Sequence, residues 1–301
     1  MLTLLAFPKP FCGHIKLIQR NAIGSWARLR PECEIILFGD EEGTAEVAKE
    51  FGLLHVSEVA RNECGTPLLS DVFEKGKQRA KHDLLCYVNC DIILKRDFLP
   101  AVKRVSEWNR RFLMVGECWN LDVAEVLASN TFTSEQDIDD LLRQSGEPRG
   151  PESVDYFVFP RELYRPLPAF VLGRAWFDQW LIWQARNLKA AVVDATAVVR
   201  AVHQNHDYLH VSGGKFYTQR GVEAIQNLKL AGGVRHCYRI SEASHKLLPA
   251  AIQRNWGGYI GRRTKEVSVK LFVRLMDSTR SLRHPLGLRM STLKKFLAWI
   301  G

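Results

Sequence analysis

The stretch from Leu84 to Leu94 constrains the fold more than any other part of the sequence. Its first half, Leu84–Val88, is apolar or aromatic throughout, which predicts a buried strand. Asn89 and Asp91 then interrupt the run, and a second apolar triplet follows at once. A carboxylate at the end of a buried strand loses hydration unless a positive group pairs with it, and in an open α/β sheet this position faces the ligand crevice. Two interpretations are open: a metal or metal–phosphate site with Asp91 and Asn89 as oxygen donors, or an Asn/Asp turn that ends the strand.

Strands and helices alternate along the chain. Apolar periodicity predicts strands at 3–7, 34–38, 53–56 and 84–88, with helices at 13–29, 44–51 and 68–80 between them. Further strands are expected at 112–116, 156–159 and 190–194, and helices at 100–111 and 177–186. Strands joined by helices of this length imply right-handed crossovers and a mostly parallel sheet. A capping box at 133–136 opens a helix that ends at Gly146, so residues 120–150 are expected to form a polar, separately folded insertion over one end of the sheet.

The composition is that of a globular protein. With 46% hydrophobic and 25% charged residues in 301, disordered and collagen-like chains are excluded. No run of about 18 apolar residues occurs, so no transmembrane helix is expected. The N-terminus lacks a basic region and reaches Pro8 early, which favours a first strand over a signal peptide. Seven cysteines without CxxC spacing indicate a reducing compartment, and argue against a disulfide framework or a structural zinc site.

The positive charge is concentrated at the C-terminal end. Residues 251–301 hold eleven Lys or Arg against two acids, which accounts for the whole net charge of +9. Within 262–301, basic residues interrupt apolar helical segments, a pattern typical of helices that lie on anionic membrane surfaces. The alternative is a helix docked on the rest of the chain or on a partner subunit. Nucleic acid is disfavoured as a partner, because the sequence has neither a known nucleic-acid-binding module nor aromatic residues interleaved with the basic ones.

Four segments that follow predicted strands carry candidate binding residues. Because the carboxyl ends of parallel strands meet at one edge of a sheet, these segments are expected to lie together and outline a nucleotide site at a switch point. Helix N-termini and small-residue loops favour phosphates at such an edge. Taken alone, each segment is only a weak indication of a binding site, and Asp40 is also typical of an ordinary turn. The residues are Phe7, Pro8 and Lys9, then Asp40, then Asn62 and Thr66, and finally Asn89 and Asp91.

Two later stretches could carry chemistry. Asp178 lies among aromatic residues, and burial there would raise its pKa and suit a general base; the alternative is that it caps the following helix. His203 and His206 are spaced three apart beside Asp207, which predicts either a cluster that contacts a metal or phosphate, or a polar loop.

The order of these features resembles the GT-A glycosyltransferases, in particular the inverting, family-two-like enzymes that use nucleotide-diphospho-sugars. The resemblance covers about residues 1–210 and implies a Rossmann-like GT-A sandwich. The catalytic domain would span 1–215, with a nucleotide-binding half at 1–95 and an acceptor half at 96–215 that contains the insertion. A basic helical extension would follow at 216–301.

The resemblance also implies roles for individual residues. The family's metal-binding DxD motif stands here as Asn89-Cys90-Asp91, without its first carboxylate. Asp91 would contact a divalent ion, Mn²⁺ or Mg²⁺, with His203 or His206 completing the metal shell. Asn89 would contact the ribose or a metal-bound water. Asp178 matches the base that deprotonates the acceptor, and Asp155 would contact the acceptor or the donor sugar. The nucleotide would be lined by Phe7, Pro8, Lys9, Asp40, Asn62 and Thr66.

The resulting hypothesis is a metal-assisted transfer of a sugar to an acceptor hydroxyl, by a cytoplasmic enzyme or one peripheral at the inner membrane face. Inversion by single displacement is expected because no second carboxylate nucleophile is evident. The acceptor would be a sugar, a lipid-linked sugar or another glycan. One alternative, a nucleotidyltransferase that makes sugar nucleotides, would need a Gly-rich basic loop after the first strand, which residues 7–11 do not supply. The other is a non-catalytic protein that binds sugar nucleotides or glycans, which Asn89 in place of a carboxylate would suit.

Overall fold

The computed structural model describes residues 1–29, 31, 33–123, 135–207 and 214–258. The predicted capping residues Thr133 and Ser134 and the basic tail at 262–301 lie outside the described residues.

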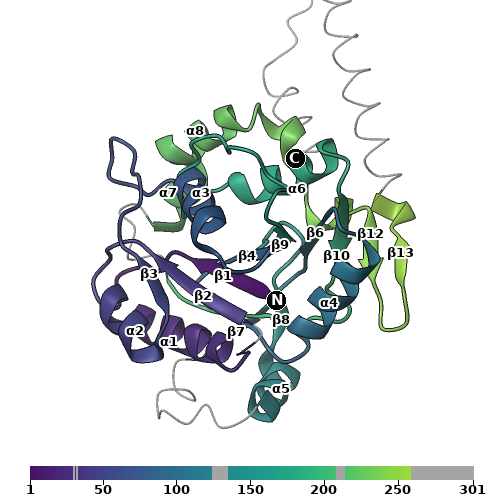
Figure 1. Cartoon of the computed structure of the whole chain (residues 1–301), viewed down its shortest axis with the longest axis horizontal. Coiled ribbons are helices and arrows are strands. Elements are labelled where there is room, and N and C mark those ends of the chain that lie inside the picture. The colour runs from purple at the N-terminus through teal and green to yellow at the C-terminus, as the bar shows by residue number, and fades with distance from the viewer. Residues whose placement is uncertain (30, 32, 124–134, 208–213, 259–301) are drawn as a thin grey trace, which may run out of the picture.

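A nine-stranded sheet forms the centre of the molecule (Figure 1), with strand order β13-β12-β10-β6-β9-β4-β1-β2-β3. Strand β9 is antiparallel to β4 and β6, and β13 is antiparallel to β12; the other neighbours are parallel. The predicted α/β architecture around a mostly parallel sheet is therefore confirmed. The strands are β1 (Leu2–Ala6), β2 (Cys33–Phe38), β3 (Leu54–Val56), β4 (Leu84–Val88), β6 (Phe112–Val115), β9 (Tyr156–Pro160), β10 (Ala191–Asp194), β12 (His245–Leu247) and β13 (Ile252–Arg254).

The chain changes direction across the sheet at β1. Strands β2 and β3 follow on one side of β1, whereas β4 pairs with its other side. Ligands of open α/β sheets bind outside the carboxyl ends of the strands at such a switch point. The loops after β1 and β4 are therefore neighbours at the position where a ligand site is expected.

Helices cover both faces of the sheet (Figure 1). Helices α1 (Gly13–Ala27), α2 (Thr44–Phe51) and α4 (Phe98–Trp108) pack on one face, and α3 (Leu69–Arg79) and α6 (Phe177–Asn187) on the other. Apolar residues at helical spacing produce this arrangement: in α1 the buried positions include Ile15, Ile18, Ala22, Ile23 and Trp26. The elements predicted between residues 1 and 95 begin and end within two residues of those observed.

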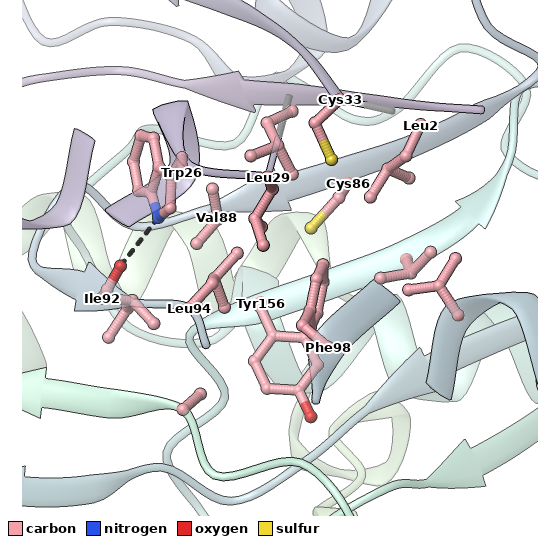
Figure 2. Close-up of a cluster of buried hydrophobic side chains, with 14 of the residues drawn as sticks. Leu2, Trp26, Leu29, Cys33, Cys86, Val88, Ile92, Leu94, Phe98 and Tyr156 are labelled. Atoms are coloured by element: carbon pink, nitrogen blue, oxygen red, sulfur yellow. Dashed lines mark hydrogen bonds between the residues drawn. The ribbon is translucent and has the colours of Figure 1, made fainter. Parts of the chain in front are cut away.

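The core beneath α1 also fixes the loop after β4. Figure 2 shows Trp26 packed near Val88 and Leu94, with its indole N–H donating to the carbonyl of Ile92 at 2.9 Å. Trp26 and Ile92 are both fully buried. Because Ile92 follows Asp91 directly, this contact anchors the backbone of the acidic residue from within the core.

A second, four-stranded sheet lies beside α1, with order β5-β11-β7-β8. Its strands are β5 (Ile92–Ile93), β11 (Val202–Gln204), β7 (Trp119–Leu121) and β8 (Glu147–Pro148). Helix α5 (Glu135–Ser145) buries Ile138 and Leu142 in the same cluster as Ile15 and Ile18 of α1. The described part of the segment predicted as a separately folded insertion, residues 120–123 and 135–150, therefore packs on the main body, because Leu121, Ile138 and Leu142 lie in this cluster.

The chain after residue 215 matches the expected helical extension only in part. Helices α7 (Gly214–Arg220) and α8 (Val222–Leu230) and two 3₁₀ turns, η1 (Val234–His236) and η2 (Ile240–Glu242), precede β12 and β13. Strand β12 pairs in parallel with β10, and Leu247 is buried in the core, so residues 245–254 extend the central sheet. Among the described residues, no helix combines the length and apolar character needed to cross a bilayer.

Candidate functional site

Asp91, after the carboxyl end of β4, is the centre of a charged cluster. Its Oδ2 lies 3.1 Å from Nε2 of His206, 3.9 Å from Nε2 of His203 and 3.8 Å from Nζ of Lys9. Lys9 follows β1, the strand next to β4, and its Nζ also lies 3.3 Å from His206 Nε2. The structure thus brings together four residues that the sequence predicted for the metal and nucleotide sites.

The cluster has the donor set of a cation site. Asp91, His203 and His206 each present one ligand atom, and these atoms lie within 4.8 Å of one another. Asp91 Oδ1 is buried and has no hydrogen-bond partner among the described residues. A buried acceptor left unsatisfied costs about 1–3 kcal/mol, and a bound cation would remove that cost. Two imidazoles and one carboxylate suit a transition ion such as Mn²⁺ better than Mg²⁺, which favours oxygen ligands. The residues present therefore fit the implied metal.

Electrostatics keep Asp91 ionised. Burial by itself would raise its pKa, but the hydrogen bond with His206 and the charges of His203, Lys9 and His206 hold the pKa well below its usual range. Burial lowers the pKa of His203, against the opposing effect of Asp91 and Asp155. A neutral imidazole beside an ionised carboxylate is the protonation state that metal ligands require.

Groups behind the two histidines orient their rings. His203 Nδ1 lies 3.1 Å from Oδ1 of Asn120 and 2.8 Å from Nη1 of Arg149. A guanidinium group only donates, so at 2.8 Å Nδ1 accepts from Arg149 and the proton lies on Nε2, on the Asp91 side. Binding a metal through Nε2 would need the other tautomer, in which Nδ1 donates to Asn120. His206 Nδ1 lies 2.5 Å from the carbonyl of Asp207, which accepts from it, and the bond from Nε2 to Asp91 needs a proton on Nε2; a metal bound by Nε2 would replace that proton. His203 belongs to strand β11 and not to a polar loop, so that alternative is wrong for this residue.

Asn89 and Arg149 hold the carboxylate of Asp155 from two sides. Strand β9 is antiparallel to β4, so the start of β9 lies beside the end of β4. Asn89 donates its backbone N–H to Asp155 O and its Nδ2 to Asp155 Oδ1, both at 3.0 Å. Arg149 Nε lies 3.0 Å from Asp155 Oδ2. In this structure Asn89 therefore binds another acid.

Asp178 lies in the first turn of α6, and its Oδ1 is buried without a hydrogen-bond partner among the described residues. Burial raises the pKa of Asp178 to about 6, with the charge of Asp155 adding to the rise and backbone N–H groups at the start of the helix opposing it. The N-cap residue of α6 is Trp176, so the alternative that Asp178 caps this helix is wrong. The charge of Asp155 acts to raise the pKa of both Asp178 and His203.

The residues predicted to line a nucleotide are divided between two places. Phe7, Pro8 and Lys9 follow β1, with Lys9 at the Asp91 cluster. Asp40 is exposed and pairs with Arg61 Nη2 at 2.5 Å, and Arg61 lies over the ring of Phe7. A surface hollow of ≈ 450 Å³ is lined there by Asp40, Ser57, Glu58, Val59, Ala60, Arg61, Asp71 and Lys75.

Asn62 and Thr66 mainly organise their own loop. Asn62 Oδ1 accepts the backbone N–H groups of Cys64 and Thr66, and its Nδ2 donates to Glu223 of α8 at 2.7 Å. Thr66 also hydrogen-bonds to Glu223 through its side chain. Their predicted role at a nucleotide stays a prediction.

Sequence reasoning missed Asn120, Arg149, Arg61 and Glu223. Asn120 could be identified only from its position opposite His203 in the small sheet, and the sequence does not reveal that strand register.

No protein-family model matches this sequence, and no curated protein matches it by sequence. Solved structures similar to it include glucosyl-3-phosphoglycerate synthase from Mycobacterium tuberculosis with Mg²⁺ and uridine diphosphate (UDP), at 15% identity and a TM-score of 0.48, covering 77% of this chain and 80% of that one. GalNAc-T7 with UDP, GalNAc and Mn²⁺ is 15% identical at a TM-score of 0.49, covering 77% of this chain and 48% of that one. TarS residues 1–349 from S. aureus with UDP is 12% identical at a TM-score of 0.33; the match covers 44% of this chain and 39% of that one.

Proposed function

We propose that this chain transfers a sugar from a nucleotide-diphospho-sugar to an acceptor hydroxyl, with the help of a divalent cation. The observation that carries the proposal is the cluster of Asp91, His203 and His206 beside Lys9 at the switch point of the sheet. The sequence resemblance to family-two-like GT-A enzymes supports the same donor class.

The residues at this edge suit the departure of a diphosphate. In the reaction the acceptor oxygen bonds to the anomeric carbon, and the bond from that carbon to the β-phosphate oxygen breaks with its electron pair on the diphosphate. Lys9, whose ammonium group lies 3.8 Å from Asp91, would meet this developing negative charge. A divalent ion held by Asp91, His203 and His206 would supply further charge neutralisation at the diphosphate.

Asp178 is a better candidate than Asp155 for the general base that deprotonates the acceptor. Asp155 Oδ1 accepts from Asn89 and its Oδ2 is ion-paired with Arg149, although without a hydrogen bond, whereas Oδ1 of Asp178 has neither kind of partner among the described residues. A carboxyl group with a pKa of about 6 is ionised at neutral pH and can take the acceptor proton. One base and no carboxylate nucleophile correspond to a single displacement with inversion at the anomeric carbon.

The experiment is a titration of the full chain with a panel of nucleotide sugars, with and without Mn²⁺, followed by product analysis with candidate sugar and glycan acceptors. Metal-dependent donor binding and donor turnover are expected. Asp178→Asn should bind the donor but lose turnover, and Asp91→Ala should weaken donor binding in the presence of Mn²⁺. Unchanged binding in Asp91→Ala would remove this residue from the site.

A non-catalytic sugar-nucleotide-binding protein is the second candidate, because Asn89 stands where the family has a carboxylate. Donor binding without turnover by any acceptor or by water would favour it.

The contact expected of residues 262–301 with a membrane or partner subunit is a further proposal. Cosedimentation of the full chain with anionic vesicles, compared with neutral vesicles and with the oligomeric state in solution, tests it.

A further inference from the structure

The turn that leads into α6 has an unfavourable backbone conformation. Trp176, two residues before Asp178, has a φ of 90°. A non-glycine residue in this region of φ is strained, and the conformation persists only when the surrounding structure holds it there. The turn must therefore be fixed by contacts from elsewhere in the molecule.

Asn227 of α8 supplies these contacts. Its Oδ1 accepts the N–H of Val171 at 3.0 Å, and its Nδ2 donates to the carbonyls of Val171 at 3.0 Å and Ala175 at 3.2 Å. The residue is fully buried, at 0% exposure. One carboxamide thus joins both ends of the segment 171–175 and uses both of its N–H donors. The carbonyl of Thr218 in α7 accepts the N–H of Ala175 at 3.0 Å, which holds the same end.

Glu223, one helical turn before Asn227, attaches α8 to the middle of the same segment. Its Oε2 lies 2.7 Å from Arg174 Nη2, and both side chains are largely buried. Its other oxygen accepts from Asn62 at 2.7 Å. Residues four apart share one face of a helix, so this face of α8 holds the turn before Asp178 and also the loop at 61–67.

We propose that Asn227 is a positioning residue for the reaction: it holds the 171–176 turn, with Trp176 in its strained conformation, so that Asp178 stays in place as the base. This inference rests on the role of Asp178 in the proposed function. Among the described residues, the side chain of Asn227 hydrogen-bonds only to backbone groups of the turn, so it acts through Asp178 and not on the substrate.

The test compares Asn227→Leu with Asn255→Leu. Asn255 is a matched control: it is also buried, and its side chain makes three hydrogen bonds to backbone groups, of Ser241, Ala243 and Gly258, in a different turn. Both variants lose the same kinds of bonds and should lose similar stability. Asn227→Leu should lower kcat by about 100-fold, the effect of a misplacement near 1 Å, with a donor KM that changes by less than about threefold. Asn255→Leu, measured on folded protein, should keep its kcat.

A double mutant tests whether the effect of Asn227→Leu depends on the strained conformation of Trp176. Glycine adopts a φ of 90° without the side-chain penalty, so a turn with Trp176→Gly should depend less on Asn227. Adding Asn227→Leu to Trp176→Gly should then lower kcat by less than about tenfold. A loss of the same size in both backgrounds, or equal kcat in Asn227→Leu and Asn255→Leu, would overturn the proposal.

A crystal structure of Asn227→Leu decides the matter independently of activity. The expected result is a negative φ at Trp176 and a displaced Asp178; an unchanged turn would refute the positioning role. If Asp178→Asn retains full transfer, the base assignment fails, while this crystal structure still shows whether Asn227 holds the turn. The two failures are therefore distinguishable.

Discussion

Replacing Asp178 by asparagine should stabilise the fold while it removes the proposed base. The pKa of Asp178 is about 6 in the folded chain against an ordinary value of 3.8. At about 1.4 kcal/mol per pH unit, this difference corresponds to at most about 3 kcal/mol of lost stability when the carboxylate is ionised. An amide has no charge to desolvate, so the variant should avoid that loss.

The stability difference between wild type and Asp178→Asn should depend on pH. Below about pH 3 the carboxyl group is protonated in both folded and unfolded chains, so wild type and Asp178→Asn should be equally stable. As the pH rises from about 4 to 6, the unfolded chain releases the proton while the folded chain retains it, and the wild type loses stability. Above about pH 7 the advantage of the variant should be constant at about 3 kcal/mol, or roughly 5 °C in Tm.

Urea unfolding at intervals from pH 4 to pH 8 measures this difference. Asp71→Asn is the matched control, because Asp71 also lies in the first turn of a helix but accepts the N–H of Ala60 at 2.7 Å and pairs with Lys75 at 3.0 Å. That control should not be stabilised at any pH. The reasoning is refuted if Asp178→Asn gains nothing at pH 8, or if its gain is the same at pH 4.

The role of Asp178 as the base also predicts the pH dependence of activity and the activity of Asp178→Asn. The kcat/KM of the wild type should fall tenfold per pH unit below about pH 6, as the base becomes protonated. Asp178→Asn should lose about 100-fold or more, the usual contribution of a general base.

Three further predictions concern the neighbouring groups. Mn²⁺ should bind more tightly than Mg²⁺ in titration calorimetry, because two of the three candidate ligands are imidazoles; equal affinities would argue against the histidines as ligands. Asn120→Leu should weaken Mn²⁺ binding by about 10- to 100-fold, since Nδ1 of His203 loses its acceptor, and an unchanged affinity would show that Asn120 does not orient this ring. Glu223→Gln should destabilise the fold by about 3 kcal/mol in urea unfolding, because it leaves Arg174 without its buried counter-charge; a loss below about 1 kcal/mol would contradict this.

Much of the fold was predictable because its signals are local. The apolar run at Leu84–Val88 and the helical spacing in α1 each depend on a few consecutive residues, and these elements form where the periodicity predicts them. The meeting of Lys9 with Asp91 was predictable for a related reason: both follow strands that are parallel neighbours, so they must emerge at one edge.

The antiparallel placement of β9 was not predictable from periodicity, because an apolar run has no direction. Only this placement brings Asp155 beside Asn89, so that the amide binds this acid. The register of the small sheet likewise sets Asn120 opposite His203, although 83 positions separate them in the chain.

The sequence by itself determined which residue types follow which strands, and hence that Asp91 and Lys9 meet at one edge of the sheet; only the resemblance added the two histidines to them. Tertiary structure alone decided what surrounds them: that Asp178 has an unpartnered buried oxygen, and that Asn227 reaches 52 residues back along the chain to the turn before it. The physical reason is that burial and hydrogen-bond partners depend on contacts between distant segments, and local sequence patterns contain no information about which segments those are.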